Sequence, residues 1–284
     1  KNASYQYIFE NNITTNVTNF GYGILMYHGS ERNTIEKNNI RTNGTFSPGI
    51  YLYDASKNRI LNNSIFTDSD SSHAINIVNN SDDNTISGNS VNRAGGNVFR
   101  LFRVGSGNPE RNNITSNPTS SSGTMSLFIN SMGAATHISF ENQTIGNYSI
   151  WGSGALLRIA NGYGAIEYTS PARGNGTSFS SDIVITNDSA FVDITQNPGL
   201  DASANVTLND IGNLGFTRPA ILRDGIMCNA STVPACINFT PLTNATVKFN
   251  VSAWGNYTVG EHAGIAFSPI DWHTAAYTAS GEVD

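Results

Sequence analysis

The stretch NTIEKNNI at residues 33–40 carries a pattern of asparagine and isoleucine, N-x-I-x-x-N-x-I, that decides the fold. The pattern occurs five times in the first half of the chain. A glutamine replaces the first asparagine of the first copy, and a valine and a threonine replace the last isoleucine of the fourth and fifth copies. The copies span residues 6–13, 33–40, 58–65, 84–91 and 112–119. Their starts are 27, 25, 26 and 28 residues apart, so the fold is built by repetition.

Each copy predicts strands rather than a helix. Its apolar residues lie two or five positions apart, and no i, i+3, i+4, i+7 series accompanies them. A second apolar segment recurs between the copies, at residues 23–27, 49–53, 74–78 and 97–101. A unit of about 26 residues with two or three short strands cannot bury its apolar face alone, so equivalent strands must stack from unit to unit. The pattern therefore predicts an all-β protein built on a right-handed parallel β-helix.

Stacking places equivalent residues of the copies in columns. We expect two interior apolar columns, one of Ile8, Ile35, Ile60, Ile86 and Ile114 and one of Ile13, Ile40, Ile65 and Val91. We expect a third column of Asn11, Asn38, Asn63, Asn89 and Asn117. Stacked asparagines hydrogen-bond through their side-chain amides to the copies above and below, and asparagine tolerates left-handed corners. We interpret this column as a structural ladder and not as a row of binding residues.

The I-x-x-N-x-I copies with the interposed segment G-I-x-L resemble the parallel β-helix repeats of the NosD-like and pectin-lyase-like superfamily, which recur in archaeal and bacterial surface proteins. The resemblance covers about residues 1–125 and implies the fold. It does not imply one function, because this scaffold carries lyases, hydrolases, epimerases, adhesins and inert wall proteins. More loosely, the segments 210–211, 219–222, 224–228 and 247–251 with Cys236 resemble the closing module of archaeal β-helix surface proteins.

The composition predicts an exported glycoprotein. Only 13% of the 284 residues are charged. The 38 asparagines and the 57 serines and threonines would form roughly eight N-x-S/T sequons by chance, whereas the chain has 17. An attached glycan lies on the surface and compensates for missing charge in solubility. Asparagine-rich turns also generate sequons by themselves, which is the alternative for the repeat region. The candidate glycosylation sites are Asn2, Asn12, Asn16, Asn43, Asn62, Asn79, Asn113, Asn142, Asn147, Asn175, Asn187, Asn205, Asn229, Asn238, Asn244, Asn250 and Asn256.

The only cysteines, Cys228 and Cys236, lie eight positions apart. Two cysteines without a third in an exported chain predict one disulfide that closes a small loop. Zinc binding is disfavoured because no histidine or second cysteine pair lies near them in the sequence. The disulfide and the sequons both predict an extracellular or cell-surface location.

Other classes of partner are disfavoured by the sequence. No run of about 18 apolar residues is present, so we expect no transmembrane segment. The formal net charge of −6 disfavours nucleic acid as a partner. The chain starts at Lys1 without a methionine or a signal peptide, which suggests a processed N-terminus or a fragment.

The repeat divides the chain into three regions. We expect the β-helix over residues 1–200, with regular coils over 1–125, a long excursion over 116–123 and irregular coils over 126–200. Residues 201–260 alternate apolar and polar positions with prolines at the joints, which predicts a small antiparallel, β-sandwich-like cap. Such a cap would close an otherwise open sheet edge. Residues 261–284 form an apolar tail that its own domain or a neighbouring subunit must cover, for example by accepting it as an added strand.

We find no catalytic group in the sequence, and expect a protein that is not an enzyme. The β-helix hydrolases of pectin-type chains use grouped acids, a Gly-His-Gly and an Arg-x-Lys, and uronate epimerases carry a Tyr-Gly-x-Asp-Pro-His. Here the only adjacent acid pair, Asp82 and Asp83, lies in a turn-forming stretch. Asp54, Lys57 and Arg59 are the nearest group suited to lyase chemistry, and they also lie in a predicted turn.

Some acids, histidines and tyrosines are candidates for metal or sugar sites. Asp68 and Asp70 could ligate calcium, although a D-x-D in a serine-rich loop is as often a solvated turn. The five histidines form no closely spaced pair of the metal-site kind; they are His28, His73, His137, His262 and His273. Tyrosines on the early coils could stack on sugar rings; they are Tyr5, Tyr7, Tyr27, Tyr51 and Tyr53. We favour the alternative that Tyr27 and Tyr53 occupy equivalent strand positions and pack on each other.

Three classes of function compete. The sequence favours a structural extracellular protein, a glycosylated subunit of a surface layer (S-layer) or an extracellular filament that self-assembles through its β-helix ends and its C-terminal tail. The alternatives are a polysaccharide-acting enzyme and a carbohydrate-binding adhesin. We expect identical subunits and glycans as partners, and no cofactor besides covalent N-glycans.

Overall fold

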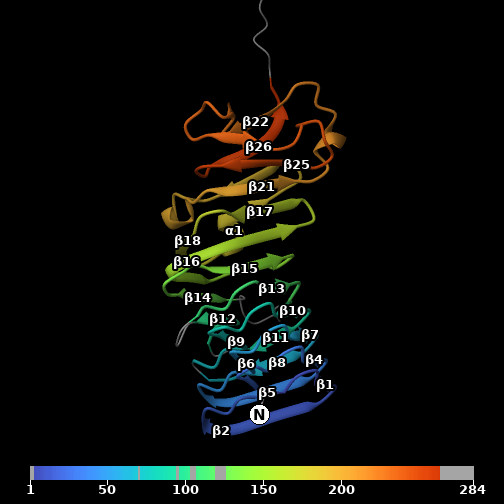
Figure 1. Cartoon of the computed structure of the whole chain (residues 1–284), viewed down its shortest axis with the longest axis vertical. Coiled ribbons are helices and arrows are strands. Elements are labelled where there is room, and N and C mark those ends of the chain that lie inside the picture. The colour runs from blue at the N-terminus through green and yellow to red at the C-terminus, as the bar shows by residue number, and fades with distance from the viewer. Residues whose placement is uncertain (1–2, 70, 94–95, 103–106, 119–125, 263–284) are drawn as a thin grey trace, which may run out of the picture.

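The computed structural model of the chain describes residues 3–69, 71–93, 96–102, 107–118 and 126–262. Within them the strands stack into a rod, with the N-terminal coils at one end and antiparallel strands at the other (Figure 1). This confirms the expectation of an all-β protein whose N-terminal part is a parallel β-helix. The apolar tail 263–284 and most of the excursion 116–123 lie outside the described residues.

Three columns of parallel strands form the coils. The first column contains β1 (Tyr7–Phe9), β4 (Thr34–Glu36), β7 (Arg59–Leu61), β10 (Thr85–Ser87), β13 (Asn112–Thr115) and β15 (Thr136–Glu141). The second contains β2 (Asn12–Asn19), β5 (Asn39–Thr45), β8 (Ser64–Thr67) and β11 (Ser90–Arg93). The third contains β3 (Ile24–Tyr27), β6 (Ile50–Tyr53), β9 (Ile75–Val78), β12 (Phe99–Phe102) and β14 (Leu127–Ser131).

The strand register confirms both apolar columns. Ile8, Ile35, Ile60, Ile86 and Ile114 are successive partners in the first column of strands. Ile13, Ile40, Ile65 and Val91 are successive partners in the second. Ile35, Ile60 and Ile86 are 0% exposed. Because each fully buried isoleucine contributes about 1.5–3 kcal/mol, these columns supply much of the free energy that holds the coils together.

Asparagine side chains also join successive coils. The Asn38 Nδ2 and main-chain N–H both donate to Asn63 Oδ1, at 3.0 and 2.9 Å. The same Nδ2 donates to the carbonyl of Ile8 in the preceding coil at 2.8 Å. Equivalent bonds to the next coil are made by Asn11, Asn63, Asn89 and Asn117, the last of them to Gln143. The third column of the repeat is therefore a ladder of side-chain amides, and a glutamine ends it.

A second ladder runs through the first asparagine of each copy. Asn58 Nδ2 donates to Asn84 Oδ1 at 3.1 Å and to the carbonyl of Ser30 in the preceding coil at 3.0 Å. The ladder consists of Asn33, Asn58, Asn84 and Asn112. This second ladder was not predicted from the sequence, although its asparagines recur at the same spacing as those of the first ladder. Each coil is thus fastened to the next at two corners.

The residue before each ladder position takes a left-handed conformation. Examples are Lys37, with φ 54°, and Lys57, with φ 60°. Outside glycine this conformation costs roughly 1–2 kcal/mol per residue. The full set of such corner residues is Tyr5, Arg32, Lys57, Asp83 and Arg111 in one column and Glu10, Lys37, Asn62, Gly88, Ser116 and Asn142 in the other. The amide bonds of the ladders and the buried isoleucines beside them offset this strain.

One long strand ends the parallel stack. β16 (Tyr148–Asn161) pairs in parallel with β14 through its first residues and with β15 through its last. It turns the corner between the two columns at Gly152, which has φ 70°. A Cβ at this position would lie 1.7 Å from the carbonyl oxygen of Ser131, so only glycine fits.

The expected run of irregular coils to residue 200 is wrong beyond Asn161. There the chain makes a two-residue hairpin into β17 (Gly164–Tyr168), and Asn161 Oδ1 accepts the N–H of Tyr163 at 2.9 Å. A two-residue hairpin returns the chain antiparallel, whereas parallel pairing needs a crossover of a dozen or more residues. From this point the described strands pair antiparallel, apart from the parallel contacts that β16 already makes.

Two antiparallel sheets form the cap. The first continues the large sheet and contains β17, β18 (Ala172–Gly176), β21 (Ala204–Leu208), β25 (Val247–Val251) and β24 (Cys236–Asn238). The second contains β19 (Ile183–Ile185), β20 (Ser189–Val192), β26 (Asn256–Glu261), β22 (Pro219–Arg223) and β23 (Ile226–Met227). Short helices α1 (Phe179–Asp182), η1 (Pro198–Leu200) and η2 (Ile211–Leu214) connect them. The rings of Phe249 and Tyr257 meet between the sheets at 6.2 Å, so the cap is sandwich-like and begins near residue 162 rather than 201.

The ladder makes a strong prediction about stability. Replacing Asn63 by alanine removes the acceptor of two Asn38 donors and the donor to the Ile35 carbonyl. Because each stranded buried group costs about 1–3 kcal/mol, we expect Asn63→Ala to lower the free energy of unfolding by about 3–5 kcal/mol in urea titrations. The matched control is Asn39→Ser, at an exposed position where the next coil carries Ser64, with an expected change within about 0.5 kcal/mol. Equal losses of unfolding free energy in the two variants would contradict a stabilising role of the ladder.

Candidate functional site

The adjacent acids Asp82 and Asp83 make contacts between coils. Asp83 forms a two-pronged ion pair with Arg111, with Nε and Nη2 at 2.8 and 3.0 Å from its carboxylate oxygens. Hydrogen bonding from Arg111 lowers the pKa of Asp83. Asp82 accepts the main-chain N–H of Glu110 at 2.9 Å, and burial raises its pKa. Asp83 has φ 57°, as the turn interpretation predicts, and the pair stabilises the corner that leads into the second ladder.

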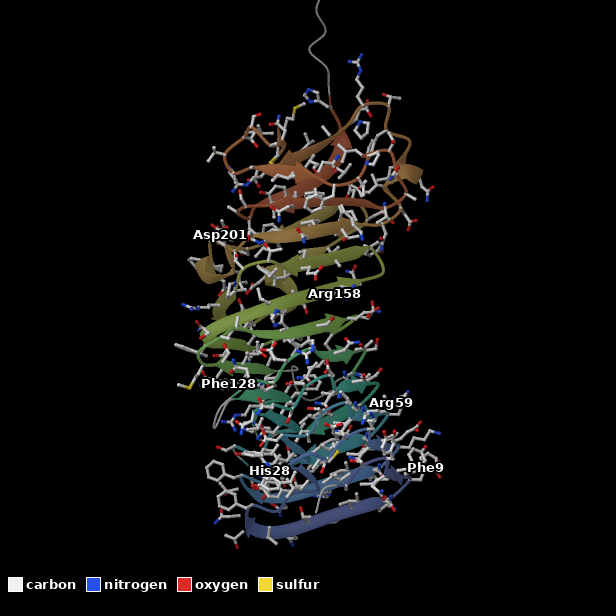
Figure 2. The ribbon with its side chains drawn as sticks, viewed as in Figure 1. Phe9, His28, Arg59, Phe128, Arg158 and Asp201 are labelled. Carbon is white, nitrogen blue, oxygen red and sulfur yellow. A yellow bond between two sulfur atoms is a disulfide. The ribbon has the colours of Figure 1, made fainter. Side chains whose placement is uncertain are left out.

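The predicted group of Asp54, Lys57 and Arg59 is divided among different contacts. Asp54 lies 3.0 Å from His28 Nδ1 in the preceding coil and accepts the main-chain N–H of Asn80 at 3.3 Å. Lys57 Nζ lies 4.0 Å from Glu31. Figure 2 shows His28 toward the middle of the rod and Arg59 toward its right edge, on the side of Phe9. The structure therefore does not gather these three side chains around one point.

The histidines are also distributed over separate coils. His137 Nδ1 lies 2.6 Å from Glu110 Oε2, and the main-chain N–H of His262 donates to the Arg218 carbonyl at 2.9 Å. His273 and Asp70 lie outside the described residues, so the calcium interpretation of Asp68 and Asp70 stays a prediction. Within the described part of the chain, no three His, Cys, Asp or Glu side chains are grouped so that they could hold a metal ion.

His73 is the buried histidine among those in the described part of the chain. It is 9% exposed, and its Nδ1 accepts the main-chain N–H of Asn97 at 3.0 Å. Burial, helped by the charge of Arg100, lowers the pKa of His73 to about 4. The ring is therefore neutral at pH 7, and because Nδ1 accepts a bond the proton lies on Nε2.

The early tyrosines stack mainly on one another. The rings of Tyr27 and Tyr53 lie 5.1 Å apart, which confirms that these equivalent strand positions pack together. Tyr51 stacks on Tyr22 with ring centroids also 5.1 Å apart. Tyr5 and Tyr7 are 73% and 59% exposed on the first coil.

The disulfide between Cys228 and Cys236 is confirmed, with Cα atoms 5.5 Å apart. It joins the segment that follows β23 to β24, and therefore links the two sheets of the cap. Cys228 and Cys236 are 5% and 2% exposed. The crosslink holds the irregular loop between them, where few strand hydrogen bonds are available.

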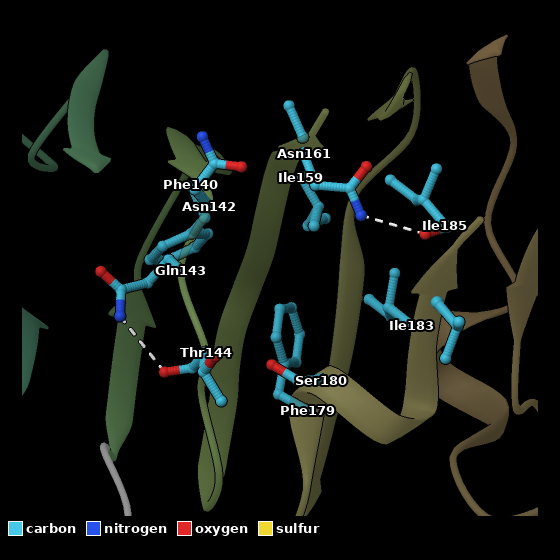
Figure 3. A pocket seen from close by; sticks show the side chains of 12 residues that line it. Phe140, Asn142, Gln143, Thr144, Ile159, Asn161, Phe179, Ser180, Ile183 and Ile185 are labelled. Carbon is cyan, nitrogen blue, oxygen red and sulfur yellow. Dashed lines mark hydrogen bonds between the residues drawn. The ribbon is translucent and has the colours of Figure 1, made fainter. Parts of the chain in front are cut away.

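Two cavities lie in and below the cap. One, of about 360 Å³, lies where the last parallel coil meets α1 and β19 (Figure 3). Its edge is fixed by two hydrogen bonds, from Asn161 Nδ2 to the Ile185 carbonyl at 3.0 Å and from Gln143 Nε2 to the Thr144 carbonyl at 3.2 Å. All its lining residues are apolar, amide or hydroxyl residues, so this cavity offers binding surface but no acid or base for catalysis. A second, of about 430 Å³, lies beside the disulfide.

Residues 2–145 match the family model described as "Right handed beta helix region", which covers half of the chain. The chain belongs to the right-handed β-helix family. No curated protein and no solved structure gave a significant match. The family fixes the hand of the coils and the architecture, and leaves the function to be argued from this β-helix protein's own surface.

Most candidate glycosylation sites of this β-helix protein lie on its surface. The exposed ones are Asn12, Asn16, Asn43, Asn62, Asn142, Asn147, Asn175, Asn187, Asn229, Asn238, Asn244 and Asn256. Asn113, Asn205 and Asn250 are partly buried, and Asn2 lies outside the described residues. Asn79 is only 4% exposed at a left-handed corner, and its burial disfavours a glycan on its amide in this fold. Within the described part of the chain, no helix has the length and apolarity needed to cross a membrane.

Glycopeptide mapping of the natural protein tests this surface directly. We expect mass spectrometry to find glycans at exposed coil sites such as Asn43 and Asn62, and an unmodified Asn79. Asn62 and Asn79 form a matched pair, because each begins an Asn-Asn-Ser sequon and the two asparagines differ in burial. A glycan at Asn79, or bare asparagines throughout the coils, would contradict the prediction.

The burial of His73 predicts a pH dependence of stability. In the unfolded chain a histidine has a pKa near 6.5, so below about pH 6.5 the unfolded state binds a proton that the folded state, with its pKa of about 4, does not. The titration of His73 therefore leaves the free energy of unfolding unchanged above about pH 6.5. As the pH falls toward 4, it lowers the free energy of unfolding progressively, by up to about 3 kcal/mol. Urea titrations across this range should show a flatter profile for His73→Gln, which cannot titrate but keeps an acceptor. Identical slopes would rule out His73 as the source.

Proposed function

We propose that this chain is a structural extracellular protein, a glycosylated subunit of a cell-surface layer or extracellular filament that assembles through its β-helix end and its C-terminal tail. The observation that supports this most is the first coil. Among the described residues β1, β2 and β3 each pair on one side only, with β4, β5 and β6. Three unpaired strand edges at one end of a rod are a template for a further coil.

The first coil also leaves both its ladder and its core incomplete. In later coils each asparagine Oδ1 of the ladder that contains Asn11 accepts two bonds from the coil before it, as Asn38 Oδ1 does from Asn11. Asn11 itself is exposed, and its Oδ1 accepts no hydrogen bond from the described residues. Ile8 and Ile13 are only partly buried, whereas Ile35 and Ile40 of the next coil are 0% exposed. A coil of a neighbouring subunit that offers free amide donors would complete the amide bonds and bury the two isoleucines, and this is the contact that we propose.

The cap offers a second contact surface. Ile226, Val233 and Phe239 are 74%, 100% and 56% exposed. Ile226 and Val233 line a neighbouring cavity of about 350 Å³, which shares Met227 and Cys228 with the cavity beside the disulfide, and Phe239 directly follows β24. β23 and β24 each pair with one described strand only. Contiguous apolar surface beside open strand edges is typical of sites that accept an added strand.

The C-terminal tail is the segment we propose for this surface in a neighbouring subunit. It starts beside the cavity, because the N–H of His262 bonds to the Arg218 carbonyl and the next residue, Pro219, lines the cavity. Its apolar residues include Ile265, Phe267, Ile270 and Trp272. Two sequon asparagines, Asn229 and Asn238, line the same cavity, so a docked tail requires that these sites carry no glycan or that their glycans point away.

The sides of the rod suit an exposed structural role. Exposed sequons are distributed from the first coil to the cap, and two of them, Asn16 and Asn43, are register partners on adjacent coils. The adjacent acids Asp82 and Asp83 are engaged in contacts between coils, Asp83 with Arg111 and Asp82 with the main-chain N–H of Glu110. These contacts favour the structural proposal over a polysaccharide-acting enzyme. A carbohydrate-binding role is favoured by a separate observation and is argued below.

Assembly is tested with the full glycosylated chain by sedimentation velocity and electron microscopy. We expect concentration-dependent growth into filaments or lattices. Tyr5→Lys with Tyr7→Lys puts charge on the exposed face of the first coil and should weaken association by at least about tenfold, because the contact would have to bury two unpaired charges. Trp151→Lys with Tyr163→Lys is the matched control, since both aromatics are also exposed but lie away from the first coil.

A variant that ends at His262 separates the two contacts. It should lose the cap contact and keep the contact made by the first coil. A wild-type chain that stays a monodisperse monomer at the highest concentration reached would overturn the proposal. Equal assembly by the first-coil variant and the wild type would overturn the role of the open end.

A further inference from the structure

A small cavity lies on the outer face of the third strand column, in the N-terminal coils. Its volume is about 130 Å³. Its floor includes Tyr51 of β6, Asn76 of β9 and Arg100 of β12, which are successive register partners. Tyr22 and His73, from the segments that lead into this column, form a wall of the cavity. The cavity is therefore built by four coils and is fixed by the strand register.

Asn76 is the unusual residue of this cavity. It interrupts the apolar strand Ile75–Val78 and is 5% exposed, yet its Oδ1 has no hydrogen-bond partner among the described residues. The ladder asparagines beside it, by contrast, use both their Oδ1 and their Nδ2. An unpartnered buried amide costs about 1–3 kcal/mol, which a purely structural position would avoid with an apolar residue. The amide points to a ligand that donates a hydrogen bond.

Aromatic rings line the cavity next to this amide. Tyr22 and Tyr51 stack with centroids 5.1 Å apart and planes within 8°. Phe20 and Phe46 stack at 5.7 Å and 16° on the same side. Flat aromatic faces bind the C–H face of a ring that carries polar groups on its edge.

The remaining polar side chains of the cavity can all donate a hydrogen bond. His73 is neutral with its proton on Nε2, because its Nδ1 accepts the N–H of Asn97. Burial raises the pKa of Tyr51 to about 12, so its phenol keeps its proton. The guanidinium of Arg100 supplies several N–H donors. The cavity therefore combines one buried acceptor, several donors and a flat apolar wall.

We propose that this cavity is a carbohydrate subsite that holds one pyranose ring of a glycan, with a ring hydroxyl donating to Asn76 Oδ1. A pyranose has an apolar C–H face for the aromatic wall and hydroxyls that both donate and accept. The volume is below the roughly 300–1,000 Å³ of sites for drug-sized ligands, which limits the occupant to a single ring. The subsite does not depend on self-assembly, so it stands or falls separately from the proposed structural role.

The test is a titration of the full chain with methyl pyranosides of glucose, galactose and mannose, followed by NMR or calorimetry. At least one should bind saturably. Asn76→Leu should weaken that binding by at least about tenfold, because it removes the only buried acceptor. The same variant should unfold at the same or a higher urea concentration, because leucine also occupies an outward position of this sheet at Leu25 and the unpartnered amide is gone.

Two further variants make the result specific. Asn130→Leu changes an outward asparagine of the same sheet, in β14 and away from the cavity, and should leave binding unchanged. Tyr22→Ala should weaken binding through loss of the aromatic wall. Failure of all three glycosides to bind, or wild-type affinity in Asn76→Leu, would overturn the proposal.

Discussion

Hydrogen bonds between stacked side-chain amides set the register of this protein. Inside the ladder Asn63 accepts two bonds at Oδ1 and donates two from Nδ2, so a strongly polar group is buried without an unsatisfied atom. The bonds form only when equivalent residues of successive coils lie in line. A slip of one residue would break both ladders and would turn the isoleucine columns outward. The amides therefore specify the stacking, while the isoleucines supply most of its free energy.

The two ends of the coil stack differ because the ladder ends differently at each. Toward the cap, Gln143 takes the ladder position and turns its Nε2 back to the carbonyl of Asn117, which satisfies the last acceptor of the column. The strand β16 and the hairpin at Asn161 then replace parallel coils by antiparallel strands. At the first coil the Oδ1 of Asn11 accepts no hydrogen bond from the described residues. The proposed contact at the first coil follows from this difference between the two ends, and not from the β-helix fold itself.

The outer face carries whatever function the scaffold supports. Its corners hold charged residues in left-handed conformations, and several of these, such as Asp83 and Arg111, pair from coil to coil. Sequon asparagines occupy many of the remaining exposed positions. Asn76 departs from this plan, because it is buried and its Oδ1 has no hydrogen-bond partner among the described residues, and it lines a cavity with aromatic rings and donors. A regular scaffold makes such a departure easy to recognise.

The N-x-I-x-x-N-x-I spacing by itself determined the strands, the parallel stacking, the interior isoleucines and the ladder through Asn38 and Asn63. These features depend on contacts between equivalent positions, which a repeat displays directly in the sequence. Cys228 and Cys236 were paired from their number alone. The tertiary structure decided the rest: the hairpin at Asn161 that moved the cap boundary, the burial of Asn79, and the cavity around Asn76. Each of these depends on contacts between residues that no repeat relates, and such contacts are set by how the whole chain packs.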